Sequence, residues 1–140
     1  LQAAVLLAKL DRFEWELERR QDLGTRYTQA LSTPAFTQAG LQVMALRPGR
    51  ESVYGQYTVR VPRRAEIQAA LQAQGIPTAV HYPKPLHHQP AYARHCCPDC
   101  CPQSIRAADE VLSLPMSADL AEADQDRVIA ALAQALGVAL

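Results

Sequence analysis

The sequence predicts an α+β fold in which a small, mostly antiparallel sheet packs on helices to form two layers. The first observation behind this prediction is that short alternating segments and amphipathic helices follow one another with short connections. The second is the composition, because 49% hydrophobic and 20% charged residues in a chain of 140 are typical of one globular core. We expect residues 1–33 to form a long interdomain helix and residues 34–140 to form the small domain that follows it.

Residues 1–31 have the pattern of one continuous helix. Apolar residues recur at helical spacing and are expected to form one face: Leu6, Leu10, Phe13 and Leu17. Ser32-Thr33-Pro34 should end the helix, because proline lacks an N–H and disfavours helical conformation in the residue before it. No capping residue precedes the helix and residue 1 is Leu rather than Met, so we expect the chain to begin inside a longer protein.

The elements after residue 34 are predicted from alternation and helical periodicity. Strands are expected over residues 41–46 and 53–61, and the second should turn Val53, Tyr57, Val59 and Val61 to one face. An amphipathic helix over 63–74 should end at Gly75. A third strand over 76–82, a helix over 105–111 and a short strand over 112–115 follow. The last helix should bury a stripe that contains Val128, Ile129, Leu132 and Leu136.

Charge and hydropathy exclude several classes of function. The chain has 14 basic and 14 acidic residues, and this balance argues against a general nucleic-acid binder, which needs a basic excess for phosphates. No stretch approaches the roughly 20 apolar residues that cross a bilayer, and the first residues lack the pattern of a signal peptide. The sequence therefore predicts a soluble, cytoplasmic protein without a nucleic-acid or membrane partner.

The segment His95–Pro102 contains all four cysteines: Cys96, Cys97, Cys100 and Cys101. Zinc prefers four ligands, and the Cys97-x-x-Cys100 spacing supplies only two of them locally. A redox-active Cys-x-x-Cys would need a βαβ setting that the pattern does not show. We therefore expect a variable loop and no metal site, with a metal or redox role as the alternatives.

A second polar segment, residues 81–92, follows the predicted third strand. It contains His81, Tyr82 and Lys84 between closely spaced prolines, as expected either for a rigid recognition loop or for a stiff structural turn. Lys84 and Lys9 are the only lysines. The chain has no Gly-rich phosphate loop, Gly-x-Ser-x-Gly elbow or His-Glu-x-x-His motif, so the spacing of residues alone indicates no complete active site.

Four segments, in order, resemble the DegT/DnrJ/StrS-type sugar aminotransferases over essentially the whole chain. They are residues 1–10, the strand Val53–Arg60, the stretch Gly75–Tyr92 with its His-Tyr-Pro motif, and Glu110–Met116 with Leu-Ser-Leu-Pro, followed by Asp126–Ile129. The Cys-rich segment departs from the family pattern, and Gly55 stands where many relatives carry histidine.

The resemblance implies a fold-type I enzyme that uses pyridoxal phosphate to move an amino group, usually from glutamate, to a keto sugar nucleotide. It implies that this chain is the C-terminal small domain of a homodimeric enzyme of amino-sugar or surface-polysaccharide synthesis. The cofactor and its catalytic lysine would belong to a large domain upstream, so no catalytic or cofactor-binding residue, and no bound cofactor, is expected here. His81 and Tyr82 match positions that contact the nucleotide sugar, and Lys84 is a candidate for its phosphate or carboxylate.

Another class of function remains open at this point. The chain could be a non-catalytic ligand-binding or interaction module, from a truncated or a regulatory member of the family. The segment that contains His81 would then hold a small molecule without chemistry.

Overall fold

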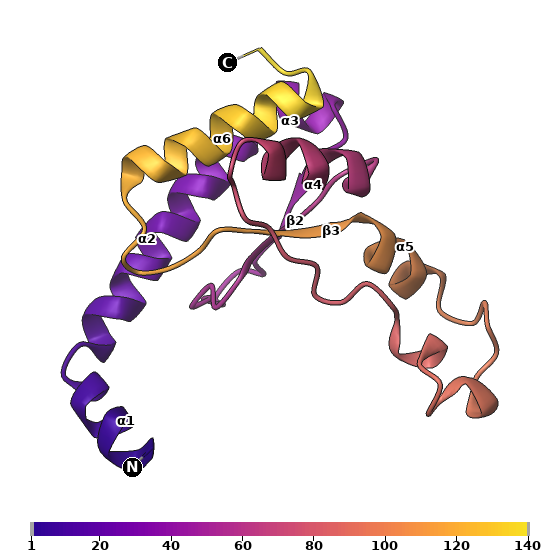
Figure 1. Ribbon diagram of the computed structural model, residues 1–140, viewed down its shortest axis with the longest axis horizontal. Helices are drawn as coiled ribbons and strands as arrows, with labels where there is room; N and C mark the ends of the chain where they lie inside the picture. The colour runs from indigo at the N-terminus through magenta and orange to yellow at the C-terminus, as the bar shows by residue number, and fades with distance from the viewer. Residues whose placement is uncertain (1, 140) are drawn as a thin grey trace.

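The computed structural model describes residues 2–139, which form a three-stranded antiparallel sheet with helices packed over one face (Figure 1). The elements, in order, are α1 (Gln2–Leu10), α2 (Phe13–Leu31), α3 (Pro34–Gln38), β1 (Gln42–Val43), β2 (Tyr57–Arg60), α4 (Arg64–Ala73), the 3-10 turns η1 (Leu86–His88) and η2 (Ala93–His95), α5 (Pro102–Glu110), β3 (Val111–Leu114) and α6 (Glu122–Leu136). The strand order is β1-β2-β3. The predicted two-layer α+β fold is confirmed.

Alternation along the central strands separates the core from the open face of the sheet. Tyr57 and Val59 of β2 and Leu112 and Leu114 of β3 are buried beneath α2, α4 and α6. The alternate residues face the other side, where Thr58 lies directly opposite Ser113 in the antiparallel register. The predicted inward face of residues 53–61 is confirmed for Tyr57, Val59 and Val61. It is wrong for Val53, which precedes the strand and is exposed.

Helix α6 closes the core by packing against both α2 and α4. Its residue Gln125 is fully buried: Nε2 donates to the Leu23 carbonyl at 2.7 Å, and Oε1 accepts from Arg26 at 3.0 Å. Arg26 also pairs with Asp126 at 2.6 Å, at the exposed edge of the contact between α2 and α6. Because exposed ion pairs contribute little, the buried apolar stripe of α6 and the Gln125 bonds carry most of this packing.

The predicted long helix is wrong in one respect, because a turn at residues 11–12 divides it into α1 and α2. The guanidinium of Arg12 lies over the Trp15 ring and pairs with Asp119 at 3.1 Å. The expected apolar face is also exposed at Leu6, Leu10 and Phe13. These residues lie on α1 and the start of α2, here called the limb, which extends beyond the core (Figure 1). The second half of α2 is packed into the core.

The predicted third strand over residues 76–82 is also wrong. This segment makes a single isolated bridge, in which Ala79 and Ser113 exchange backbone hydrogen bonds of 3.1 and 2.8 Å. Two residues from this bridge, Pro77 and the facing Pro115 both lack an N–H, so the ladder cannot continue in that direction. The strand predicted over 41–46 is shortened to β1, Gln42–Val43. The helix predicted over 63–74 is α4, and its expected end at Gly75 is confirmed by the left-handed φ of 72° at that residue.

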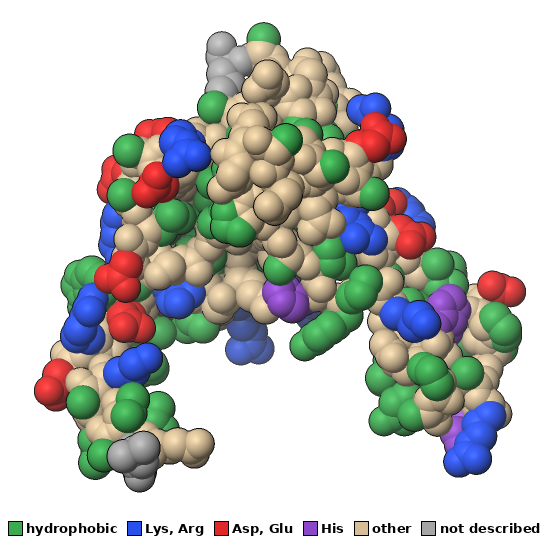
Figure 2. Space-filling model, in the orientation of Figure 1, with side chains coloured by type: hydrophobic (Ala, Val, Ile, Leu, Met, Phe, Trp, Pro, Cys, Tyr) green, Lys and Arg blue, Asp and Glu red, His purple; other side chains and the backbone are tan. Residues whose placement is uncertain are grey.

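Residues 83–101, here called the arm, leave the sheet and return to it through α5 (Figure 1). The arm and the limb that ends in α1 project to the same side, and Figure 2 shows a wide concave face between them. Among residues 2–139, no helix has both the length and the hydropathy that crossing a bilayer requires.

Two buried tyrosines, Tyr27 and Tyr57, should make the free energy of unfolding depend on pH in the alkaline range. Burial raises the pKa of Tyr57 to about 12 and raises the pKa of Tyr27 further above its usual 10. Below pH 10 both phenols are neutral in the folded and unfolded chains, so their contribution to stability is fully present. Between pH 10 and 12 the unfolded chain releases these protons first, and the free energy of unfolding should fall. Urea midpoints measured across this range test this, and Tyr57→Phe should flatten the slope; a midpoint independent of pH would contradict it.

Candidate functional site

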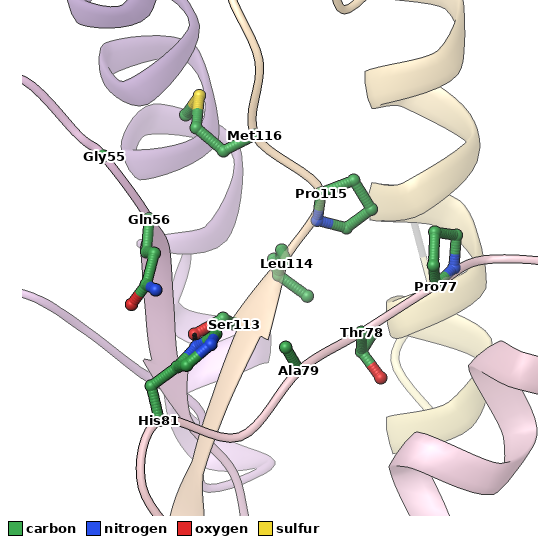
Figure 3. A pocket seen from close by; sticks show the side chains of 10 residues that line it. All are labelled: Gly55, Gln56, Pro77, Thr78, Ala79, His81, Ser113, Leu114, Pro115 and Met116. Atoms are coloured by element: carbon green, nitrogen blue, oxygen red, sulfur yellow. Dashed lines mark hydrogen bonds between the residues drawn. The ribbon is translucent and has the colours of Figure 1, made fainter. Parts of the chain in front are cut away.

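A hollow of about 280 Å³, here called the His81 hollow, lies beside the C-terminal end of β3 (Figure 3). Three segments from distant parts of the sequence line it: Gly55–Gln56 before β2, residues 77–81, and Ser113–Met116. The side chains of His81 and Ser113 approach each other at one end, with Gln56 next to them. No residue that lines this hollow carries a fixed charge, and its polar groups are an imidazole, hydroxyls and an amide.

A chain of hydrogen bonds on the open face of the sheet holds His81. Its Nδ1 lies 3.3 Å from Ser113 Oγ, and that hydroxyl lies 2.9 Å from Thr58 Oγ1 on the neighbouring strand. The backbone of Ser113 is bonded to Ala79 at the same time, which fixes the segment two residues before the imidazole. Ser113 is only 5% exposed, so this support belongs to the sheet rather than to the loop. The arrangement leaves Nε2 of His81 as the ring nitrogen able to bind a ligand.

A second hollow, of about 240 Å³, lies on the other side of His81 and brings the three predicted site residues together. His81, Tyr82 and Lys84 all line it, opposite small residues of α5 such as Ser104 and Ala107. The Tyr82 ring stands edge-on to the imidazole, with centroids 5.8 Å apart, and it is 75% exposed. The phenol, the imidazole and the ammonium group are thus free to reach a ligand above this surface.

Sequence reasoning missed Ser113 and Thr58, which support His81, and Gln56, which lines the same hollow. The signal was present in part, because Thr58 and Gln56 belong to the polar face predicted for residues 53–61. Ser113 lies between two leucines in a strand predicted from its apolar residues, and only the antiparallel register shows that it faces Thr58.

The described residues do not fit a pyridoxal phosphate site. Such a site needs a lysine in an enclosed pocket and a cradle of donors for the phosphate. Lys9 is exposed on α1, and Lys84 is exposed on the arm. Lys9 adjoins a hollow lined by aliphatic side chains and Gln2, without the donors that a phosphate requires.

The four cysteines are reduced and exposed at the end of the arm, away from both hollows. Cys100 donates its thiol to the Cys97 carbonyl at 3.0 Å, and hydrogen bonding with Cys100 raises the pKa of Cys97. Within residues 2–139, no group of three or more His, Cys, Asp or Glu side chains is placed to hold a metal ion. That no metal binds here stays a prediction.

Comparison with known proteins gives a family match over most of the chain. The model of the DegT/DnrJ/EryC1/StrS aminotransferase family matches residues 1–133. The chain is 43% identical over 132 residues to a UDP-2-acetamido-2-deoxy-3-oxo-D-glucuronate aminotransferase of Pseudomonas aeruginosa, covering 94% of this chain and 35% of the relative. The chain therefore spans about a third of the length of the curated relatives it matches.

Two solved structures share the fold. A DegT/DnrJ/EryC1/StrS aminotransferase from Brucella abortus is 40% identical with a TM-score of 0.85, covering 97% of this chain and 35% of that protein. DesV of S. venezuelae, in complex with a ketimine intermediate, is 34% identical with a TM-score of 0.89, covering 99% of this chain and 37% of that protein. The arrangement of α2, α4 and α6 over the sheet is therefore that of a domain of DegT/DnrJ/EryC1/StrS aminotransferases.

Proposed function

We propose, because this chain belongs to the DegT/DnrJ/EryC1/StrS aminotransferase family, that it is the C-terminal portion of an enzyme that aminates a keto sugar nucleotide. Glutamate is the proposed amino donor, and pyridoxal phosphate is the proposed cofactor of the whole protein. The relative in Pseudomonas aeruginosa, whose substrate is a UDP-linked keto sugar, supports this substrate class. The family match also favours a portion of an aminotransferase over the alternative of a separate ligand-binding module.

The observation that carries this proposal is that His81 lines two hollows, the first without a fixed charge and the second with Lys84 as its one charged residue. Sugar hydroxyls need directional donors and acceptors, and an imidazole and a phenol provide them without a fixed charge. Lys84, at the edge of the second hollow, would attract a phosphate or a carboxylate of the same ligand. In this proposal Ser113 orients the imidazole, Tyr82 contacts the sugar, and Lys84 binds the anionic part.

The cofactor belongs, in this proposal, to the part of the protein that precedes the chain, since the described residues do not fit it. Pyridoxal phosphate supplies the electron sink that lets an amino group leave one carbon and join another. The chain's own contribution is to bind and orient the sugar. A homodimeric assembly, a cytoplasmic location and a role in polysaccharide synthesis stay predictions.

Accordingly, the isolated chain should not form a specific internal aldimine with pyridoxal phosphate. Both lysines are exposed, so their amines should react only weakly and non-selectively with the aldehyde. Titration of the purified chain, followed by visible absorbance, should show no saturable band. A stoichiometric band that disappears in Lys84→Ala, but persists in Lys9→Ala, would contradict this expectation.

The proposed function is tested by following nitrogen in the full-length protein that contains this chain. With the cofactor, ¹⁵N-glutamate and a UDP- or dTDP-linked keto sugar, we expect the label in the amino-sugar nucleotide by mass spectrometry. If the loaded protein reacts with glutamate but passes no label to any of these sugars, the proposed substrate class is wrong. If it does not react with glutamate either, the proposed aminotransferase activity is wrong.

A further inference from the structure

The end of the arm has a pattern that the proposed function does not use. Residues 96–101 consist of two adjacent cysteine pairs on either side of Pro98-Asp99, and all four thiols are reduced and exposed. We call Cys96–Cys97 the first pair and Cys100–Cys101 the second pair. All four side chains lie outside the core, so their thiols are accessible to a thiophilic ligand and are not explained by packing.

The turn at Pro98-Asp99 brings the two pairs together. The Cys100 thiol donates a hydrogen bond to the carbonyl of Cys97 at 3.0 Å, and this bond joins the residues on the two sides of the turn. Within the second pair the two sulfurs lie 3.9 Å apart. The turn therefore places the second pair against the backbone of the first, so a ligand with two binding centres has only this turn to span.

The middle and the C-terminal end of this segment are anchored to regular structure. His88 of η1 donates from Nε2 to the Pro98 carbonyl at 2.7 Å, which holds the turn against the arm. On the other side, the Cys101 carbonyl accepts from the N–H groups of Ser104 and Ile105 in the first turn of α5. A ligand that joins the two pairs would therefore meet a segment with a restricted conformation, and it would lose less entropy on binding.

The geometry limits the class of ligand that this site can hold. Zinc requires about four protein ligands, and within the described residues no set of three or more is placed to hold a metal ion. A trivalent organoarsenical needs only two thiolates, because its third bond is to its own carbon. Thiolates are the soft ligands that such thiophilic centres prefer.

We propose that residues 96–101 are a double dithiol site that captures trivalent organoarsenicals, with one arsenic on each cysteine pair. At each pair, two S–H bonds and two As–OH bonds break, while two As–S bonds and the O–H bonds of two waters form. Arsenic stays trivalent and sulfur is not oxidised, so the step needs no oxidant or reductant. A ligand with two arsenic centres would bind both pairs across the Pro98-Asp99 turn.

The test uses the full-length protein, reduced with a phosphine, with its free thiols counted before each measurement. Two probes are used: phenylarsonous acid, which has one arsenic, and a biarsenical fluorescein dye, which has two. A variant with all four cysteines changed to serine is the blank, so that thiols elsewhere in the protein are subtracted. By intact mass, we expect two phenylarsenic groups per chain above this blank.

The paired variants separate the two halves of the site. Cys96→Ser with Cys97→Ser, or Cys100→Ser with Cys101→Ser, should each leave one phenylarsenic group and weaken dye binding about 100-fold or more, since bivalency is lost. The matched control Cys97→Ser with Cys100→Ser keeps two thiols that are not adjacent, and it should hold phenylarsenic less tightly than either paired variant.

Two results would overturn the proposal. One is uptake of fewer than two phenylarsenic groups by the protein with four free thiols. The other is dye binding that is equally tight in the wild type and in the paired variants. Because neither readout depends on amino transfer, the proposal can fail while the proposed function stands, and the reverse is also true.

Discussion

Replacing Leu132 with alanine should lower the free energy of unfolding by about 2–5 kcal/mol. Leu132 is fully buried in α6, at the centre of the cluster that contains Tyr57, Leu71 and Leu112. The change removes apolar contacts and leaves a cavity that the surrounding helices and sheet can fill only in part. Urea unfolding of the purified chain, followed by circular dichroism, measures the loss.

Leu7→Ala is the matched control for this prediction, since it removes the same atoms from a side chain that is 67% exposed on α1. We expect it to change the free energy of unfolding of the chain by no more than about 0.5 kcal/mol. Equal losses in the two variants would show that α6 does not pack over the sheet as described.

Replacing Gly24 with alanine should destabilise the fold by about 1–3 kcal/mol, although alanine favours a helix by about 0.5–1 kcal/mol over glycine. A Cβ atom on Gly24 would lie 2.3 Å from Cδ2 of Tyr54 and 2.5 Å from its Cε2. The Tyr54 ring is buried against Tyr57, and its carbonyl accepts from Arg20 at 3.2 Å, so it cannot move aside freely.

Gly55→Ala is the control for the Gly24 variant, because its Cβ would meet no atom within 4 Å and its φ lies outside the left-handed region. Its free energy of unfolding should stay within about 0.5 kcal/mol of the wild type. Tyr54→Ala should also reduce the cost of Gly24→Ala, since the two groups share one contact. A more stable Gly24→Ala chain would contradict the close approach of α2 to Tyr54.

The sequence was most informative where an element has one apolar face and a clear boundary. The periodicity of α6 and the alternation of β2 predicted most of the residues that are buried there, although Leu136 at the end of α6 is only partly buried. In α1 the same pattern misled, since Leu6 and Leu10 have the spacing of a buried face but lie on a limb beyond the core. Periodicity shows that a face is apolar, but it does not show what covers it.

The sequence indicated the exposed residues of the candidate site, but it did not indicate the residues that support His81. His81, Tyr82 and Lys84 stand out because polar aromatic residues and prolines follow one another at the end of an extended segment. The support of His81 comes from Ser113 and Thr58, which are 55 residues apart and meet only through the pairing of β2 with β3. A pairing over that distance depends on the whole sheet, and local patterns do not encode it.

The most direct test of the central claim compares the two half-reactions of the full-length protein when His81 or Tyr82 is changed. If these side chains bind sugar hydroxyls, each lost hydrogen bond costs about 0.5–1.5 kcal/mol. His81→Ala and Tyr82→Phe should then each lower kcat/KM for the keto sugar nucleotide by about 2- to 13-fold. The half-reaction with the amino donor and the thermal midpoint should change little, and the control Tyr92→Phe, on the arm, should change neither half-reaction. If instead both variants unfold early while their folded fraction keeps full activity toward the sugar, the segment is only a stiff turn and the account is wrong.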